Sequence, residues 1–240
     1  MLPAIDRLLR VKGGFLKMLS DKYIDMLDYK LFFTLKNETW QQALDRYIMF
    51  CEADMKDYFL TKTYAYRFAD NKAYTLHTPQ AIEPQSIDLF TANWGIEVPR
   101  QLTDLLCTYG AMCIGDGLLT LFDDKEQSSP ILSLSQVLDK YGYSDFIQQI
   151  RPGILKSVSG FYFFFGVIFA QSDEMAFLYF SKAGHFGKML FSKVNQDLVL
   201  NKILPAMFNG SIDKYTLDTL ISSLIDRVII NALTVRGYLA

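Results

Sequence analysis

Four carboxylates lie within a short stretch near the middle of the chain: Asp116, Asp123, Asp124 and Glu126. Two carboxyl groups held close together can act as general acid and general base, and several together can bind a divalent cation. The spacing does not follow that of an EF-hand loop, and the last three residues belong to the polar segment DDKEQSS. The sequence therefore favours a solvated loop over a catalytic or metal site, and it leaves an anionic docking surface as a third interpretation.

The remaining reactive side chains do not form a recognisable catalytic pattern. His77 and His185 lie in no metal-binding spacing, so we expect each to occupy a surface or turn position. Gly115, Asp116 and Gly117 form only a G-x-G pattern, and a strand-like segment follows them, whereas phosphate binds at a helix N-terminus. We therefore expect a protein that is not an enzyme and that needs neither a cofactor nor a metal.

The cysteines and the apolar segments indicate the cellular compartment that we expect for the protein. Cys51, Cys107 and Cys113 are few, odd in number and without C-x-x-C spacing, so we expect buried, reduced thiols in a cytoplasmic protein. Charged residues interrupt the N-terminal apolar residues, which argues against a signal peptide. The most apolar run, residues 161–170, is about half as long as a membrane helix, so we expect no membrane association and a strand buried on both faces.

A helix and a strand bracket the glycine-rich turn that contains Asp116. Pro99 suits the first helical position, and Gly110 can end the helix in the left-handed conformation. Between them, apolar residues recur at helical spacing and predict one buried face. These residues are Leu102, Leu105, Leu106 and Tyr109. A short apolar strand is expected at residues 118–122.

Further helices and strands follow from the same patterns. Aromatic and β-branched residues predict a β-meander formed by residues 161–170, 175–181 and 188–191. We expect short helices near residues 87–93 and 134–141, and a helix over residues 195–208 that is capped by Asn195. Thr39 and Gln42 form a capping box before an amphipathic helix, and Asp213 is a candidate cap for the last helix. The segment bracketed by Gly153 and Gly160 is predicted to be a connection.

These elements predict an α+β fold in which an antiparallel β-meander sheet packs with several helices, after an N-terminal region of helices and a β-hairpin. Residues 1–80 would form that N-terminal region, residues 84–150 an acidic region, and residues 151–240 the meander with the terminal helices. The last two regions would be separate domains or a single domain over 84–240. The proline-containing segment 77–86 is the candidate linker.

The charge of the chain is unevenly distributed. Residues 1–80 contain 12 Lys or Arg and 10 Asp or Glu, residues 81–150 contain 3 and 10, and residues 151–240 contain 9 and 6. The net charges of +2, −7 and +3 account for the total of −2. The total argues against a direct nucleic-acid binder, whereas the middle region would attract a basic partner. A solubilising surface would explain the same distribution.

Two segments resemble a known group of proteins. The run WGIEVPRQLTDLLCTYGAMCIGDGLLTLFDD is similar to the GAD-like domain of bacterial immunity proteins. The later run FYFFFGVIFAQSDEMAFLYF, followed by HFGKMLF, resembles the companion C-terminal domain of those proteins and also the meander of the SUKH superfamily. The resemblance covers about residues 84–210 and does not extend to residues 1–80. It implies an immunity protein that neutralises a toxin, commonly a nuclease and in some cases one delivered by type VI secretion, with no fixed catalytic residues.

The resemblance and the charge distribution lead to one expectation about function. The chain would bind a cognate toxin, a basic nuclease domain, and inhibit it by blocking its active site or substrate groove. The alternatives are a non-catalytic scaffold or regulatory binding module, and a divalent-metal enzyme that uses the acidic cluster. The candidate toxin-binding residues are Trp94, Glu97, Asp104, Asp116, Asp123, Asp124 and Glu126.

Overall fold

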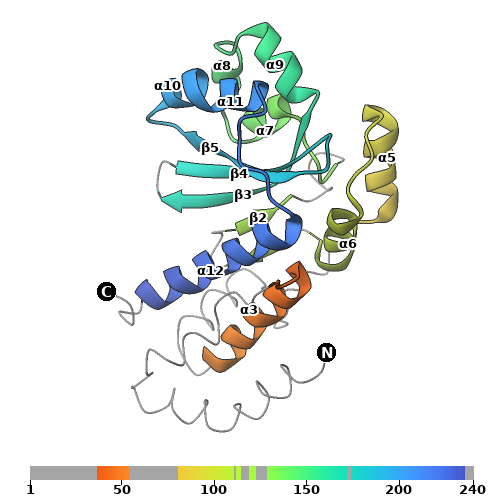
Figure 1. Ribbon diagram of the computed structural model, residues 1–240, viewed down its shortest axis with the longest axis vertical. Coiled ribbons are helices and arrows are strands. Elements are labelled where there is room, and N and C mark those ends of the chain that lie inside the picture. Colours follow the sequence, from red (N-terminus) through yellow and green to blue (C-terminus); the bar gives the residue numbers. More distant parts are fainter. Residues whose placement is uncertain are drawn as a thin grey trace. The chain divides into compact units, whose positions relative to one another are not determined.

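A computed structural model of the chain describes residues 37–54, 81–110, 112–114, 119–122, 129–171 and 174–235 (Figure 1). The chain divides into two compact units, residues 76–220 and residues 1–75 together with 221–240. The second boundary falls inside helix α12 (Leu217–Val235). Among the described residues, none of the helices combines the length and the apolar character needed to cross a membrane.

The larger unit is built on an antiparallel sheet, as the sequence predicted, and this sheet has five strands. Its strands lie in sequence order, β1-β2-β3-β4-β5, and each pairs antiparallel with the next. Their bounds are Cys113–Ile114, Leu119–Leu121, Tyr162–Gln171, Glu174–Ser181 and Phe186–Ser192. Pairing of β2 with β3 brings residues from the acidic middle region and from the later meander into one sheet.

Strand β3 is the middle strand of the sheet, and most of its residues are buried. Residues 162–168 are all buried, so both faces of this strand are covered, as its continuous apolar run predicted. A β-bulge lies between Phe164 and Gly166, where the register against β4 shifts. A Cβ atom on Gly166 would lie 2.8 Å from the Thr120 carbonyl oxygen and 2.9 Å from a Leu121 methyl carbon. The close approach of β2 therefore requires glycine at this position.

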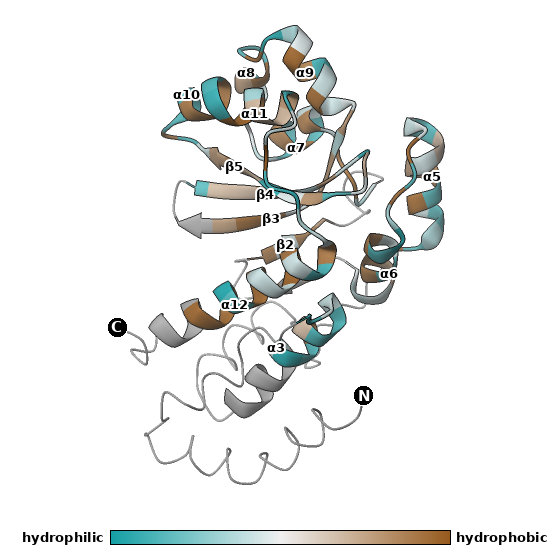
Figure 2. Ribbon diagram, viewed as in Figure 1, coloured by the Kyte–Doolittle hydropathy of each residue, from teal (hydrophilic) through white to brown (hydrophobic). Residues whose placement is uncertain are grey.

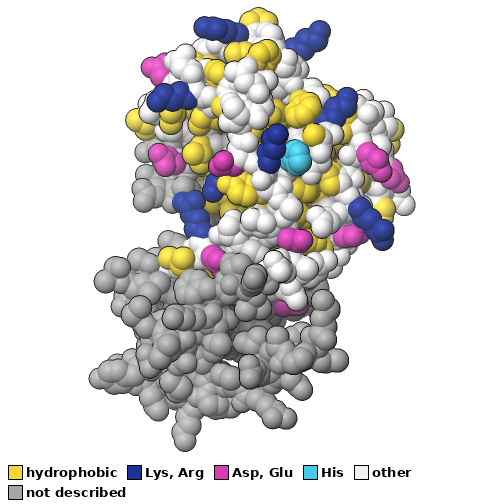
Figure 3. Space-filling model, viewed as in Figure 1, with side chains coloured by type: hydrophobic (Ala, Val, Ile, Leu, Met, Phe, Trp, Pro, Cys, Tyr) yellow, Lys and Arg dark blue, Asp and Glu magenta, His cyan; other side chains and the backbone are white. Residues whose placement is uncertain are grey.

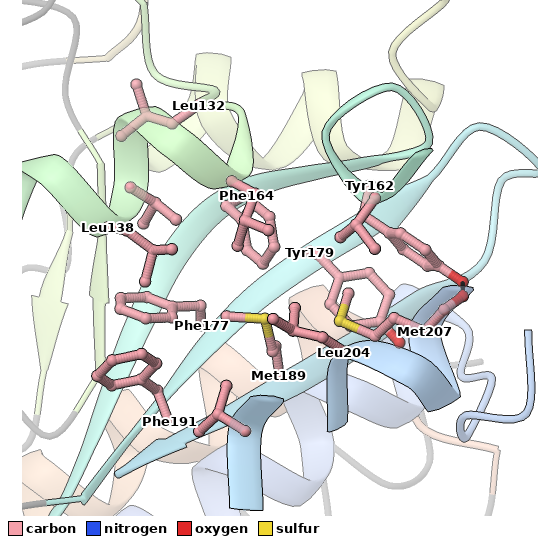
Figure 4. Packing of buried hydrophobic residues seen from close by; sticks show 14 of the residues in the cluster. Leu132, Leu138, Tyr162, Phe164, Phe177, Tyr179, Met189, Phe191, Leu204 and Met207 are labelled. Carbon is pink, nitrogen blue, oxygen red and sulfur yellow. Dashed lines mark hydrogen bonds between the residues drawn. The ribbon is translucent and has the colours of Figure 1, made fainter. Parts of the chain in front are cut away.

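Helices cover one face of the sheet and enclose a hydrophobic core on that face. They are α7 (Leu134–Lys140), α8 (Ser144–Ile147), α9 (Pro152–Ser159), α10 (Gln196–Leu198), η2 (Val199–Ile203) and α11 (Leu204–Phe208). Aromatic residues of β3, β4 and β5 meet leucine and methionine side chains of these helices in this core (Figure 4). At its margin the Tyr162 hydroxyl donates a hydrogen bond of 2.9 Å to the Met207 carbonyl oxygen.

Local sequence signals explain where several of these helices begin and end. Ser133 and Gln136 form a complete capping box at the start of α7, and Gly142 follows α7 with φ 79°. The side chain of Asn195 accepts a hydrogen bond from the Leu198 backbone N–H, which confirms the predicted cap. The helix that follows contains the π-helical turn η2 just before Pro205. Proline lacks the N–H for the usual helical bond, which accounts for the wider turn at this point.

Three details of the sequence prediction are wrong. The segment between Gly153 and Gly160 is helix α9 and not a connection, because Pro152 opens a helical turn there. Asp213 does not cap the last helix; Thr216 does, since its hydroxyl oxygen accepts the Thr219 N–H at 3.1 Å. The proposed linker includes the first turn of helix α5 (Pro84–Trp94) and buried Ile82, while residues 77–80 lie outside the described part.

The smaller unit contains helix α3 (Trp40–Asp54) and the part of α12 from Ile221 onward. Thr39 and Gln42 cap α3 reciprocally, at 2.9 and 3.3 Å, as the sequence predicted. Hydrophobic and hydrophilic residues alternate along α12 (Figure 2), as expected for an amphipathic helix. The other predicted elements of residues 1–80 lie outside the described residues.

A buried ion-pair network links helices α3 and α12 within the smaller unit. The Arg46 guanidinium on α3 donates hydrogen bonds to both carboxylate oxygens of Glu38, at 2.8 and 2.9 Å. It also contacts Asp226 on α12 at 2.7 Å and the Ser222 carbonyl oxygen at 3.5 Å. The side chain of Glu38 is fully buried and that of Arg46 is 5% exposed. Buried charges of this kind require partners, and the network supplies them.

Candidate functional site

Two consecutive helices, α5 and α6 (Arg100–Tyr109), position the described candidate residues. Pro84 occupies the first turn of α5, and Gly95 ends it with φ 61°, donating its N–H to the Thr91 carbonyl oxygen at 2.8 Å. Pro99 precedes the first residue of α6, one position earlier than predicted, and Gly110 ends the helix as predicted. Both helices therefore end at a glycine, and we refer to these two consecutive helices as the hairpin.

The inner side of this hairpin is apolar. The predicted buried face of α6, Leu102, Leu105, Leu106 and Tyr109, is confirmed. On α5, Phe90 places its ring edge against Phe163 of β3 with 5.4 Å between centroids. The Ile82 N–H donates to the Leu106 carbonyl oxygen at 3.1 Å, which connects the residues before α5 to the end of α6. The hairpin is thus fixed on the sheet face opposite the helices of the main core.

The outer side of the hairpin is acidic with two large apolar side chains. We call this the acidic hairpin surface, and its exposed members are Glu83, Asp88, Leu89, Trp94, Glu97 and Asp104. Arg100 is the one basic residue between positions 81 and 110. Acidic side chains are visible over the α5 side of the molecule in Figure 3. The surface therefore combines negative charge with exposed apolar area.

Three of these carboxylates, Asp104, Glu83 and Asp88, lie close enough to the Cys107 thiol to affect its pKa. Burial raises the pKa of Cys107, and the negative charges of Asp104, Glu83 and Asp88 raise it further. Cys107 is free and only partly buried, whereas the sequence predicted full burial. A raised pKa disfavours the thiolate, so this cysteine is poorly suited to nucleophilic chemistry. The arrangement fits a docking surface better than a reactive centre.

The Trp94 ring contacts buried aromatic residues and is also partly exposed to solvent. Its ring stacks on Phe90 with 6.2 Å between centroids and meets Phe163 edge-on at 5.5 Å. Nevertheless 41% of the residue is exposed, and Leu89 on the same helix is 59% exposed. Contacts on one side hold the indole in place, and its other side is accessible to a partner. A held aromatic ring loses little conformational freedom on binding.

The structure places three of the seven predicted site residues on this surface. Trp94, Glu97 and Asp104 are exposed there, and Asp104 lies 3.9 Å from Arg100. Asp116, Asp123, Asp124 and Glu126 lie outside the described residues.

Three further members of the acidic hairpin surface were not predicted from the sequence: Glu83, Asp88 and Leu89. The signal that could have identified them is the amphipathic pattern of α5, in which Ile87 and Phe90 are buried between exposed positions. The prediction for this helix began at residue 87, so its first turn was missed.

No three histidine, cysteine, aspartate or glutamate side chains in the described part of the chain are grouped so as to hold a metal ion. His185 is exposed in the turn between β4 and β5, as predicted, and His77 lies outside the described residues.

No protein-family model, curated protein sequence or solved structure matches the chain.

Proposed function

We propose that the chain is an immunity protein that binds a toxin with a basic nuclease domain and inhibits it, using the acidic hairpin surface. The observation that carries the proposal is the grouping of exposed carboxylates beside exposed Trp94 and Leu89 on α5 and α6. In this proposal the chain performs no catalysis, contacts no nucleic acid directly and uses no cofactor. Its activity is to occupy a surface that the toxin needs.

The two kinds of side chain on this surface have different effects on binding. Glu83, Asp88 and Asp104 supply negative charge that accelerates the approach of a basic partner. Affinity in protein interfaces comes mainly from a few buried aromatic and apolar residues, and Trp94 and Leu89 are available for that role. The surface thus has both features expected of a docking site for a positively charged protein.

A nuclease carries positive charge where it contacts phosphates. An acidic surface that docks at this position would replace the nucleic acid and exclude substrate. Docking beside the groove, with obstruction of substrate entry, would use the same charge complementarity. Both arrangements predict that salt weakens the association, because exposed charges are screened by ions.

The test measures, by surface plasmon resonance, how fast the chain associates with the protein encoded by the neighbouring gene. That protein is produced as a catalytically inactive variant. We expect the triple variant Glu83→Lys, Asp88→Lys, Asp104→Lys to associate at least about tenfold more slowly at low salt. A matched control reverses three exposed carboxylates elsewhere, Asp145, Glu174 and Asp197. Equal slowing in both triple variants would show that only net charge matters and would overturn the assignment of the surface.

One further variant separates affinity from electrostatic steering, and another tests the acidic residues at positions 123–126. Trp94→Ala should raise the dissociation rate while leaving the association rate nearly unchanged, because it removes apolar contact and no charge. Charge reversal at Asp123, Asp124 and Glu126 tests whether that segment adds to the same steering.

The biological readout is survival. Co-expression with the active toxin should protect cells, and loss of binding should remove the protection. Tight binding to a protein that is not a toxin would instead favour the scaffold alternative.

A further inference from the structure

Strand β5 forms one edge of the sheet in the larger unit. It is the last strand in the order β1-β2-β3-β4-β5 and pairs with β4 on one side only (Figure 1). On its other side, Tyr215 is the only described residue that pairs with it, at Phe186. The Phe186 N–H donates to the Tyr215 carbonyl oxygen at 3.0 Å, and the Tyr215 N–H donates to the Phe186 carbonyl oxygen at 2.9 Å. The edge is therefore paired at its first residue.

This bridge establishes which peptide groups of β5 point away from the sheet. Residues of an antiparallel strand alternate between bonding to one neighbour and bonding to the other side. Because Phe186 directs both its groups outward, Lys188, Leu190 and Ser192 do so as well. The outward peptide groups of Lys188 and Leu190 have no hydrogen-bond partner among the described residues. The strand thus presents unpaired donors and acceptors next to a position where one bridge already forms.

The side chains along the edge add an apolar contact. Leu190 is 53% exposed, whereas Met189 and Phe191 on either side of it point into the main core. Lys188 is exposed two residues earlier. A lysine on an edge strand ordinarily discourages pairing with another strand, since two lysines brought opposite each other repel. Any pairing of this edge must therefore keep Lys188 away from a second positive charge.

We infer that β5 pairs antiparallel with β5 of a second copy of the chain, with Leu190 on the two-fold axis. In this register Leu190 lies opposite Leu190 of the second copy, and Lys188 lies opposite the Ser192 side chain of that copy. The lysines are thus separated, and the two exposed leucines cover each other. Strand β5 ends at Ser192, so the second copy does not reach Phe186, which stays bridged to Tyr215.

The same edge of both copies takes part, which gives a closed dimer with one continuous sheet and not a fibre. A single pair of short strands buries less surface than a standard stable interface, so the dimer is expected to be weak. The second copy is preferred over a foreign strand because the register is self-complementary: it matches leucine with leucine and lysine with serine.

Analytical ultracentrifugation of the full chain over a concentration series tests the inference. We expect reversible dimerisation that Leu190→Pro abolishes, because proline removes the outward N–H without removing a bond to β4. Leu190→Thr keeps the outward N–H and removes most of the apolar contact, so it should weaken dimerisation without abolishing it. Leu89→Ala, which removes an equally exposed leucine from α5, should dimerise like the unchanged chain. Circular dichroism establishes that each variant is folded.

Cross-linking then tests the register. Residues opposite each other in this type of pair have Cα atoms about 5.5 Å apart, which permits a disulfide. Leu190→Cys should form a cross-linked dimer under mild oxidation faster than Lys182→Cys, an exposed position in the turn before β5. A monomer at all concentrations, undiminished dimerisation of Leu190→Pro, or equal cross-linking of the two cysteine variants would overturn the inference. Binding of a foreign extended strand to a monomeric chain at β5 would also overturn it.

Discussion

Gly187 of β5 is the direct partner of Tyr179 of β4, and the phenol ring of Tyr179 occupies the space that a Cβ atom on residue 187 would need. The ring cannot move aside easily, because Tyr162 meets it edge-on at 5.0 Å and Phe164 lies 6.1 Å away on the same face. Because glycine has no side chain, the Tyr179 ring can pack directly against the backbone at Gly187.

Gly187→Ala should destabilise the larger unit by about 1–3 kcal/mol, the usual cost of an overpacked core. Urea unfolding followed by tryptophan fluorescence, to which Trp94 of the larger unit contributes, measures this change. Gly153→Ala is the matched control, because nothing lies within 4 Å of a Cβ at that position of α9. Alanine favours a helix over glycine, so the control should be neutral or stabilising by up to about 1 kcal/mol. Equal effects of the two substitutions would contradict the packing assignment.

Arg46→Met should destabilise the smaller unit strongly, because it leaves the buried carboxylate of Glu38 without its bidentate partner. Removing one member of a buried ion pair costs about 3–5 kcal/mol. Denaturant unfolding measures the loss, and hydrogen exchange in α3 and α12 localises it. The double variant Glu38→Gln, Arg46→Met should recover part of the stability, since no unpaired buried charge remains.

Arg100→Ala provides a comparison for the buried network. Arg100 is 94% exposed and lies 3.9 Å from Asp104, so its ion pair is screened by water and its removal should not measurably change stability. A loss at position 100 comparable to that at position 46 would contradict the distinction between the two pairs.

The stability of the larger unit should fall at alkaline pH. Burial raises the pKa of Tyr179, and the nearby Tyr162, Asp213 and Tyr215 raise it further; burial also raises the pKa of Tyr162. The folded state therefore holds these protons more tightly than the unfolded chain, in which tyrosine ionises near about pH 10. The stabilisation is complete below that pH and is lost progressively above it.

Thermal melting between about pH 8 and pH 11 tests this dependence. Tyr179→Phe keeps the ring over Gly187 but cannot ionise, so its melting temperature should fall less steeply above about pH 10 than that of the unchanged chain. At pH 8 both phenols are neutral in the folded and unfolded states, and that pH provides the reference for each variant. Identical slopes in the two proteins would rule out Tyr179 as a source of the alkaline loss.

Cys107 should react slowly with alkylating agents. Its pKa is raised first by burial and then by Asp104, Glu83 and Asp88, so little thiolate is present at neutral pH. Iodoacetamide labelling, read by mass spectrometry at the peptide that contains Cys107, measures the rate. Asp104→Asn should increase the rate modestly and Asp145→Asn should not. No difference between these variants would mean that the carboxylates of the acidic hairpin surface do not act on this thiol.

The sequence predicted the elements that are defined by strong local patterns. Helix α6 has an uninterrupted apolar face between Pro99 and Gly110, and β3 to β5 consist of aromatic runs separated by short turns. Helix α9 was missed because its eight residues include Gly153 and carry a single buried residue, Val158. Asp213 is as good a cap as Thr216 by residue type, and only the position of α12 in the fold distinguishes the two.

The candidate site was predicted less completely than the fold. Trp94, Glu97 and Asp104 were selected because they lie in an acidic region, which sequence can show. Glu83 and Asp88 join them because Phe90 packs on Phe163, and that contact orients α5. Residues 90 and 163 are far apart in the sequence, so periodicity alone could not reveal which carboxylates would share one side.

The strict sequence order of the five strands has a consequence for how the chain folds. Each strand pairs with the strand before it, so β3, β4 and β5 can associate through two short turns, with little loss of chain entropy on closing each loop. We expect this three-stranded segment to form early and to serve as the template on which the flanking helices condense. Gly187 and Tyr179, which meet inside it, would then affect the folding rate as well as the final stability.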